Sequence, residues 1–180
     1  EGAGSAAEVL AQEWPSYGAF VLSFVIIAVS WVGHHRRFRV IERFDSGLIV
    51  LNLVLLFGVV SVPFSTSLLA DFAPQPPAVA VYAATVAFIL IAQLVCWIYA
   101  CRAGLVADSV DRAVFWAVVW DVVPTILVFL VSIPFALFVD GYGATYLWLA
   151  LLVISPVLGQ IVPRLIDRRY PPKEGDPLVE

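Results

Sequence analysis

Long apolar runs separated by short polar connections dominate this sequence. A helix needs about 20 mostly apolar residues to cross about 30 Å of hydrocarbon, and five stretches approach or exceed that length without a Lys or Arg. The predicted spans are Pro15–Gly33, Gly47–Phe64, Ala78–Cys101, Ala113–Val139 and Ala144–Pro163. The pattern therefore predicts an all-α fold, a polytopic transmembrane helix bundle, with residues 1–180 forming a single transmembrane domain.

The basic residues predict the orientation of these spans. All 10 Lys and Arg residues fall on one side of them. They form three clusters: Arg36, Arg37, Arg39 and Arg43; Arg102 and Arg112; and Arg164, Arg168, Arg169 and Lys173. Basic residues in short loops mark the cytoplasmic face. We therefore expect a multi-pass protein of the cell (plasma) membrane, with the C-terminal tail Arg164–Glu180 in the cytoplasm.

The connections and the composition agree with this topology. The loops His34–Ser46 and Arg102–Arg112 are expected inside, and the loop Ser65–Pro77 outside. Apolar residues make up 62% of the chain and charged residues 13%, with a mean hydropathy of +0.96. A soluble domain is about half apolar and a quarter charged. The lipid bilayer is thus the expected surrounding of this chain.

The predicted topology also implies a further segment before Glu1. The chain contains no Met, and Glu1 falls on the outer side of the predicted topology. A cleaved signal peptide or a preceding membrane helix would be needed to carry Glu1 across the membrane. We expect a preceding helix, and hence six spans in the intact protein.

Polar side chains inside the spans are the first candidates for function, since each is costly in lipid unless paired. Ser30 and His34 share one helix face, and Trp31 lies three residues before His34 and four before His35. Asn52 lies roughly 7–8 Å from the inner end of the next span, the depth of Ser30 and Trp31. These residues predict either a network near a permeation path or a hydrogen bond between helices worth around 0.6 kcal/mol.

Asp121 and Gln93 are the other intramembrane polar candidates. Asp121 lies roughly 12 Å inside its span, and Gln93 lies at the matching depth of the preceding span. One interpretation is a proton or cation site at Asp121. The other, which we favour, is a carboxyl group that is hydrogen-bonded to Gln93 or faces a wet crevice near the inner surface.

Several classes of site are not predicted. Gly141-Tyr142-Gly143 lacks the preceding Thr-Val and the re-entrant loop of a potassium-channel filter, and is expected to be a turn. No hydrolase triad, zinc motif, phosphate loop or dinucleotide fingerprint is present. We therefore expect no enzyme activity, no metal site, no cofactor and no nucleic-acid partner.

Part of the chain resembles a known family. The residues that carry the resemblance are Ser23-Phe24, Trp31-Val32-Gly33-His34-His35-Arg36-Arg37-Phe38-Arg39, Asn52 and Pro63-Phe64. They closely resemble the transmembrane protein 175 family, the endolysosomal potassium channel of animals and its bacterial homologues. The resemblance is specific over about Trp14–Asp71 and looser beyond. A single six-span unit resembles the bacterial form, which assembles as a homotetramer.

The resemblance implies a potassium channel without the usual filter loop. In the family the first of six helices lines the pore with apolar side chains, and this helix, with its Arg and Phe-Ser-Asp signature, has no counterpart in the chain. Trp31, Asn52 and one of His34 or His35 match positions whose side chains hydrogen-bond around that signature. The resemblance thus implies that these residues support the pore helix.

The function expected from the sequence is passive, potassium-selective conduction through the central pore of a homotetramer. K⁺ is the permeant ion, and an apolar constriction that gates by dewetting replaces the Thr-Val-Gly-Tyr-Gly filter. Two alternatives remain open. One is a proton-coupled secondary transporter that uses Asp121, and the other is a membrane assembly subunit that does not conduct.

Overall fold

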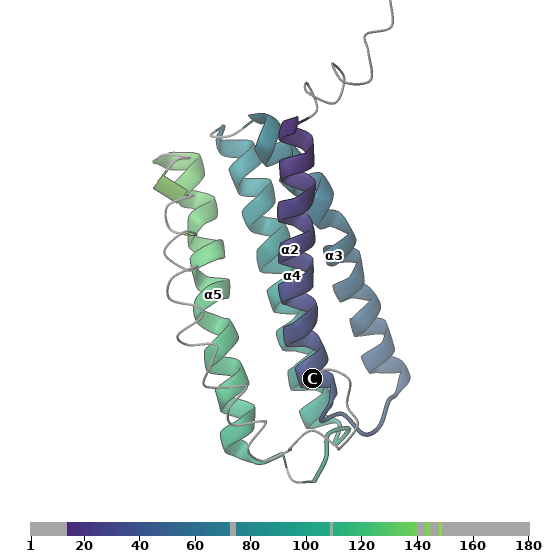
Figure 1. Cartoon of the computed structure of the whole chain (residues 1–180). Coiled ribbons are helices and arrows are strands. Elements are labelled where there is room, and N and C mark those ends of the chain that lie inside the picture. The colour runs from purple at the N-terminus through teal and green to yellow at the C-terminus, as the bar shows by residue number, and fades with distance from the viewer. Residues whose placement is uncertain (1–13, 73–74, 109, 140–142, 145–147, 149–180) are drawn as a thin grey trace, which may run out of the picture.

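Four helices lie side by side in the computed structural model (Figure 1). The structure describes residues 14–72, 75–108, 110–139, 143–144 and 148. The long helices are α2 (Trp14–Phe38), α3 (Ser46–Phe72), α4 (Pro76–Arg102) and α5 (Arg112–Phe138). Within these residues there is no β-strand, and the only extended pairing is one isolated bridge. The prediction of an all-α fold is confirmed.

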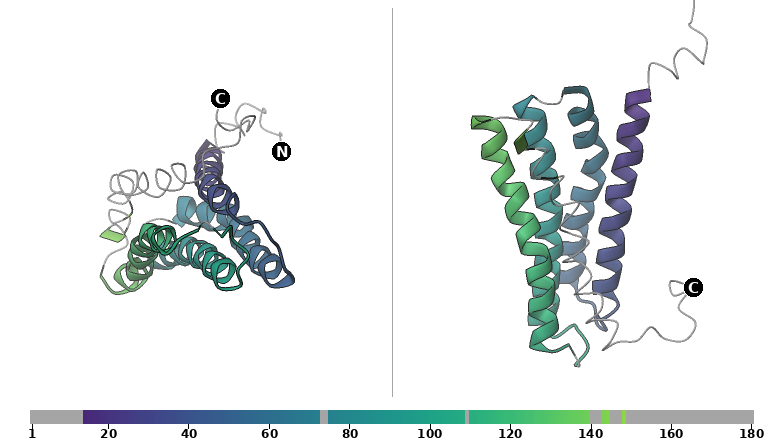
Figure 2. Two further views of the ribbon diagram at one scale, coloured as in Figure 1. Left: turned by 90° about the horizontal axis from the view of Figure 1, so that it is seen from below. Right: turned by 60° about the vertical axis from the view of Figure 1, so that its left-hand side comes forward.

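Three of the helices, α3, α4 and α5, are long and apolar enough to cross a membrane. The predicted span Pro15–Gly33 lies within the 25-residue helix α2. Helix α4 packs against both α3 and α5, and α2 packs against α3 (Figure 2). The span Ala144–Pro163 and the tail Arg164–Glu180 lie almost entirely outside the described residues, so the single domain of five spans stays a prediction.

Two helices are longer than the apolar runs that predicted them. Helix α2 continues to Phe38, so the first residues of the expected loop His34–Ser46 are helical. Helix α3 continues to Phe72 and takes up much of the expected loop Ser65–Pro77. A helix satisfies its own backbone groups and does not need lipid to persist. The apolar run predicted the most apolar part of each helix but not the residue at which the helix ends.

The two loops at the basic end of the bundle are joined to each other. Ile41 and Val106 form an antiparallel bridge, and the Ala107 amide donates to the Val40 carbonyl over 2.9 Å. Val40 is buried against Trp97 of α4. We call residues 40–43 and 104–107 together the inner clasp. It ties the α2–α3 connection to the α4–α5 connection.

Helices α3 and α4 pack closely at Gly58. A Cβ atom placed on Gly58 would lie 2.7 Å from Phe88 and 2.9 Å from Ile89. Small residues allow membrane helices to pack closely in this way. We expect Gly58→Leu to lower the free energy of unfolding by about 1–3 kcal/mol because the helices must separate. Unfolding in mixed micelles measures this change. Ala70→Leu, at an exposed position of α3, is the control, and equal losses in both variants would contradict the close contact.

Asp45 caps the start of α3 and links it to α4. Its carboxylate accepts hydrogen bonds from the Leu48 amide at 2.8 Å and from the Tyr99 hydroxyl at 2.7 Å. Both bonds favour the charged form and hold the pKa of Asp45 below its ordinary value. Asp45 therefore contributes stability above its unfolded pKa and loses that contribution as the pH falls through its folded pKa.

This linkage predicts an acid-dependent loss of stability. As the pH falls below the ordinary Asp pKa of about 3.9, the unfolding midpoint of the unmodified protein should drop more steeply than that of Asp45→Asn. The Asn variant keeps an acceptor oxygen for the cap but has no charge to lose. Unfolding curves across this pH range measure the difference. Asp108→Asn, at an exposed position of the other basic-end loop, should follow the unmodified protein.

Candidate functional site

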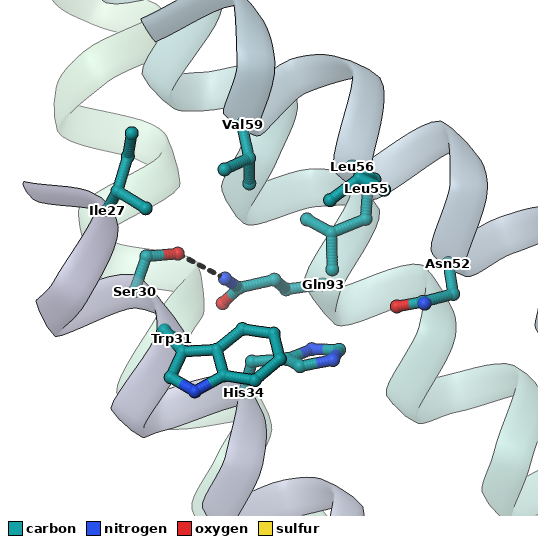
Figure 3. A pocket seen from close by; sticks show the side chains of 9 residues that line it. All are labelled: Ile27, Ser30, Trp31, His34, Asn52, Leu55, Leu56, Val59 and Gln93. Atoms are coloured by element: carbon teal, nitrogen blue, oxygen red, sulfur yellow. Dashed lines mark hydrogen bonds between the residues drawn. The ribbon is translucent and has the colours of Figure 1, made fainter. Parts of the chain in front are cut away.

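A small pocket lies between α2, α3 and α4 and combines polar side chains with apolar walls (Figure 3). Its lining consists of Ile27, Ser30, Trp31, His34, Asn52, Leu55, Leu56, Val59 and Gln93. The aliphatic residues come from α2 and α3, whereas the polar residues come from all three helices. Within the described bundle, five of the predicted site residues meet here, whereas His35 and Asp121 do not line the pocket.

The polar lining follows from helix geometry. Ser30 and His34 are one turn apart, so both face the pocket from α2. Asn52 reaches it from α3 at the depth that the sequence predicted. The structure therefore brings Ser30, Trp31, His34 and Asn52 together, and adds Gln93 from α4. Their role in a channel stays a prediction.

The structure distinguishes the two adjacent histidines. His34 is 9% exposed and lies between two rings, with centroids 5.7 Å from Trp31 and 4.0 Å from Phe38. His35 is partly exposed and does not line the pocket. Consecutive helical residues point about 100° apart, so only one of the pair can face this site. That residue is His34.

Gln93 is the centre of the hydrogen bonding in the pocket. Its Nε2 donates to the Ser30 hydroxyl over 2.6 Å, and its Oε1 accepts from the Arg37 guanidinium. Of the two environments expected for the Asp121 carboxyl, the hydrogen bond to Gln93 is not found among the described residues, whereas the wet crevice stays a prediction. Matching depth across one hairpin suggested that pairing, but the Gln93 side chain is turned toward α2.

Asp121 lies outside the pocket lining, half-buried on α5. It interacts electrostatically with Arg37, which is also bonded to Gln93. Arg37 was missed as a site residue because it was counted only as a marker of the inner face. Its spacing of seven residues from Ser30 is the sequence signal that puts both on one helix face.

The pocket is suited to holding a polar group by hydrogen bonds. Asn52 makes no side-chain hydrogen bond to another described residue, so its amide retains donors and acceptors. Trp31 is 62% exposed on the outer surface of α2. No group of three His, Cys, Asp or Glu residues suited to a metal occurs in the part of the chain that the structure describes. The pocket can therefore donate and accept hydrogen bonds, but the described residues offer it no metal ligands.

The chain has relatives among known proteins. Residues 2–63 match the model of the family described as the endosomal/lysosomal potassium channel TMEM175. The chain is 35% identical over 112 residues to a Streptomyces collinus protein named a potassium channel, covering 60% of this chain and 54% of that protein. It is 42% identical over 103 residues to a Chamaesiphon minutus protein also named a potassium channel, covering 55% and 51%.

An animal relative carries a different name. A Danio rerio protein named the endosomal/lysosomal proton channel TMEM175 is 40% identical over 53 residues, which cover 29% of this chain and 10% of that protein. The chain spans about half the length of the bacterial relatives it matches. No solved structure matches the chain.

Proposed function

We propose that the chain is part of a potassium-selective channel of the TMEM175 family, whose model matches residues 2–63. The channel conducts K⁺ passively through the central pore of a homotetramer in the plasma membrane, with the C-terminus in the cytoplasm. The names of the Streptomyces collinus and Chamaesiphon minutus relatives support conduction of K⁺. The apolar helices support a position within a bilayer.

The convergence of Trp31, His34 and Asn52 in one pocket is the observation that carries this proposal. All three lie within the part of the chain that matches the family. Polar side chains are costly inside an apolar membrane bundle, so their presence marks positions with a function. We propose that these residues hydrogen-bond to a pore helix and hold it where an apolar constriction can widen or dewet.

Current through the full-length protein tests the function. The protein is placed in a planar bilayer with K⁺ on one side and Na⁺ on the other, at equal pH. A reversal potential close to the K⁺ equilibrium value is the expected result. Absence of current would support a subunit that does not conduct and would overturn the proposal.

Proton conduction is the second candidate, because the Danio rerio relative is named a proton channel. A pH gradient imposed without a K⁺ gradient tests it directly. If the reversal potential follows the proton gradient, the permeant ion is H⁺. A proton-coupled transporter that uses Asp121 would instead lose coupled transport in Asp121→Asn, whereas a potassium channel should keep its selectivity in that variant.

A further inference from the structure

Arg37 differs from the neighbouring basic residues of α2. Arg36 is exposed, whereas Arg37 is partly buried and its guanidinium reaches a side chain of α4. Helical side chains lean toward the N-terminal end of their helix, so Arg37 extends back along α2. Its guanidinium lies over Gly33, one turn earlier, where a Cβ atom would lie 3.6 Å from an Arg37 nitrogen, an ordinary van der Waals distance.

A single α4 side chain connects two turns of α2. Gln93 accepts a hydrogen bond from Arg37 and donates one to Ser30, 2.6 Å away. Ser30 and Arg37 are seven residues apart and so lie on the same face of α2. Gln93 is 5% exposed, so its side chain is enclosed by the bundle where it meets α2.

The residues between these two attachment points include the pocket residues of α2. Trp31 and His34 both lie between Ser30 and Arg37, so their positions depend on that stretch of helix. The inner clasp holds α2 only beyond its end, through Val40 and Ile41. Among the described residues, the two Gln93 hydrogen bonds join this stretch to α4.

We propose that Arg37 is a positioning residue of the channel, acting through Gln93 to hold the Ser30 face of α2 against α4. The pocket residues Trp31 and His34 then meet Asn52 in a fixed arrangement. This inference rests on the proposed function, since the pocket is argued to support the pore helix. Arg37 does not touch the permeant ion; it acts through α2.

The test compares Arg37→Gln with Arg36→Gln in the full-length protein. Both variants remove one positive charge from adjacent positions, but only the first removes the guanidinium bonded to Gln93. Arg37→Lys keeps the charge and is the conservative variant. Two readouts are made on folded, vesicle-reconstituted protein: K⁺ current per channel protein, and amide hydrogen exchange over residues 27–34.

Arg37→Gln is expected to lower the K⁺ current on the order of tenfold, a typical coupling between sites, and to speed amide exchange over residues 27–34. Arg36→Gln should change neither readout, and Arg37→Lys should restore part of the current. The double variant Arg37→Gln with Gln93→Leu should lose no more K⁺ current than the more strongly affected single variant, because both substitutions break the same hydrogen bond.

Each other outcome has a distinct meaning. If Arg37→Gln matches Arg36→Gln in both readouts while the unmodified protein conducts K⁺, the positioning role is wrong and the proposed function stands. Losses that simply add in the double variant also overturn the role. If the unmodified protein carries no K⁺ current, the proposed function fails, and with it the positioning role, even where exchange has accelerated.

Discussion

Replacing Gln93 with Leu is expected to lower the free energy of unfolding by about 2–4 kcal/mol, the largest stability change we predict. Leucine fills a similar volume, so the loss comes from hydrogen bonds and not from a cavity. The Arg37 guanidinium would lose its acceptor and Ser30 its donor. A hydrogen bond to a charged group is worth about 1.5–3 kcal/mol, above the average of about 0.6 kcal/mol between membrane helices, and the neutral bond to Ser30 adds about 0.5–1.5 kcal/mol.

Unfolding in mixed micelles of rising denaturing-detergent fraction measures this loss. Gln93→Glu is the matched comparison, since a carboxylate still accepts from Arg37 and the loss should be smaller. Thr85→Val is the control on the same helix, because among the described residues the Thr85 hydroxyl donates to the Val81 carbonyl of α4 and to no other helix. A loss in Gln93→Leu no greater than in Thr85→Val would show that the bonds across helices contribute little.

The combined substitution Trp31→Ala and Asn52→Ala is expected to have the largest effect on conduction, lowering K⁺ current at least tenfold. Both side chains line the pocket from different helices, α2 and α3. Their removal takes away the Trp31 indole donor and the Asn52 amide, which are proposed to hold the pore helix. Coupling free energies of about 1–3 kcal/mol correspond to changes of 5–150-fold.

Bilayer recordings on the reconstituted double variant measure this effect, with oligomer size checked by light scattering. Val60→Ala with Leu53→Ala is the matched control, because these exposed residues of α3 are absent from the pocket lining. If conduction and oligomer size both survive in Trp31→Ala with Asn52→Ala, these two residues do not support the pore helix.

Hydropathy and helix periodicity were sufficient to predict the helices and part of the pocket. Counting 1.5 Å per residue from the inner ends brought Ser30 and Asn52 to one depth, and the structure places both in the same pocket. The choice between His34 and His35 could not be made from spacing, because either can approach Trp31. It depended on which face of α2 packs against α3 and α4.

The partners of Gln93 could not be predicted in this way. The depth of a residue along its helix does not determine toward which neighbouring helix its side chain points. Asp121 was considered as a partner because it lies at matching depth in the next helix of the same hairpin. A basic residue near the inner end was taken to face water, yet the Arg37 stem is long enough to return into the bundle. The position of the Arg37 guanidinium, over Gly33 and beside Gln93, becomes known only once α2 and α4 are packed together.

The inner clasp joins two segments that are synthesised at different times. Residues 40–43 leave the ribosome before α4 has been synthesised, so their hydrogen-bonding partners at 104–107 do not yet exist. Until α4 and residues 104–107 are made, Val40 and Ile41 lack both the cover of the bundle and these backbone partners. A chain halted before Val106 would therefore leave this apolar segment uncovered.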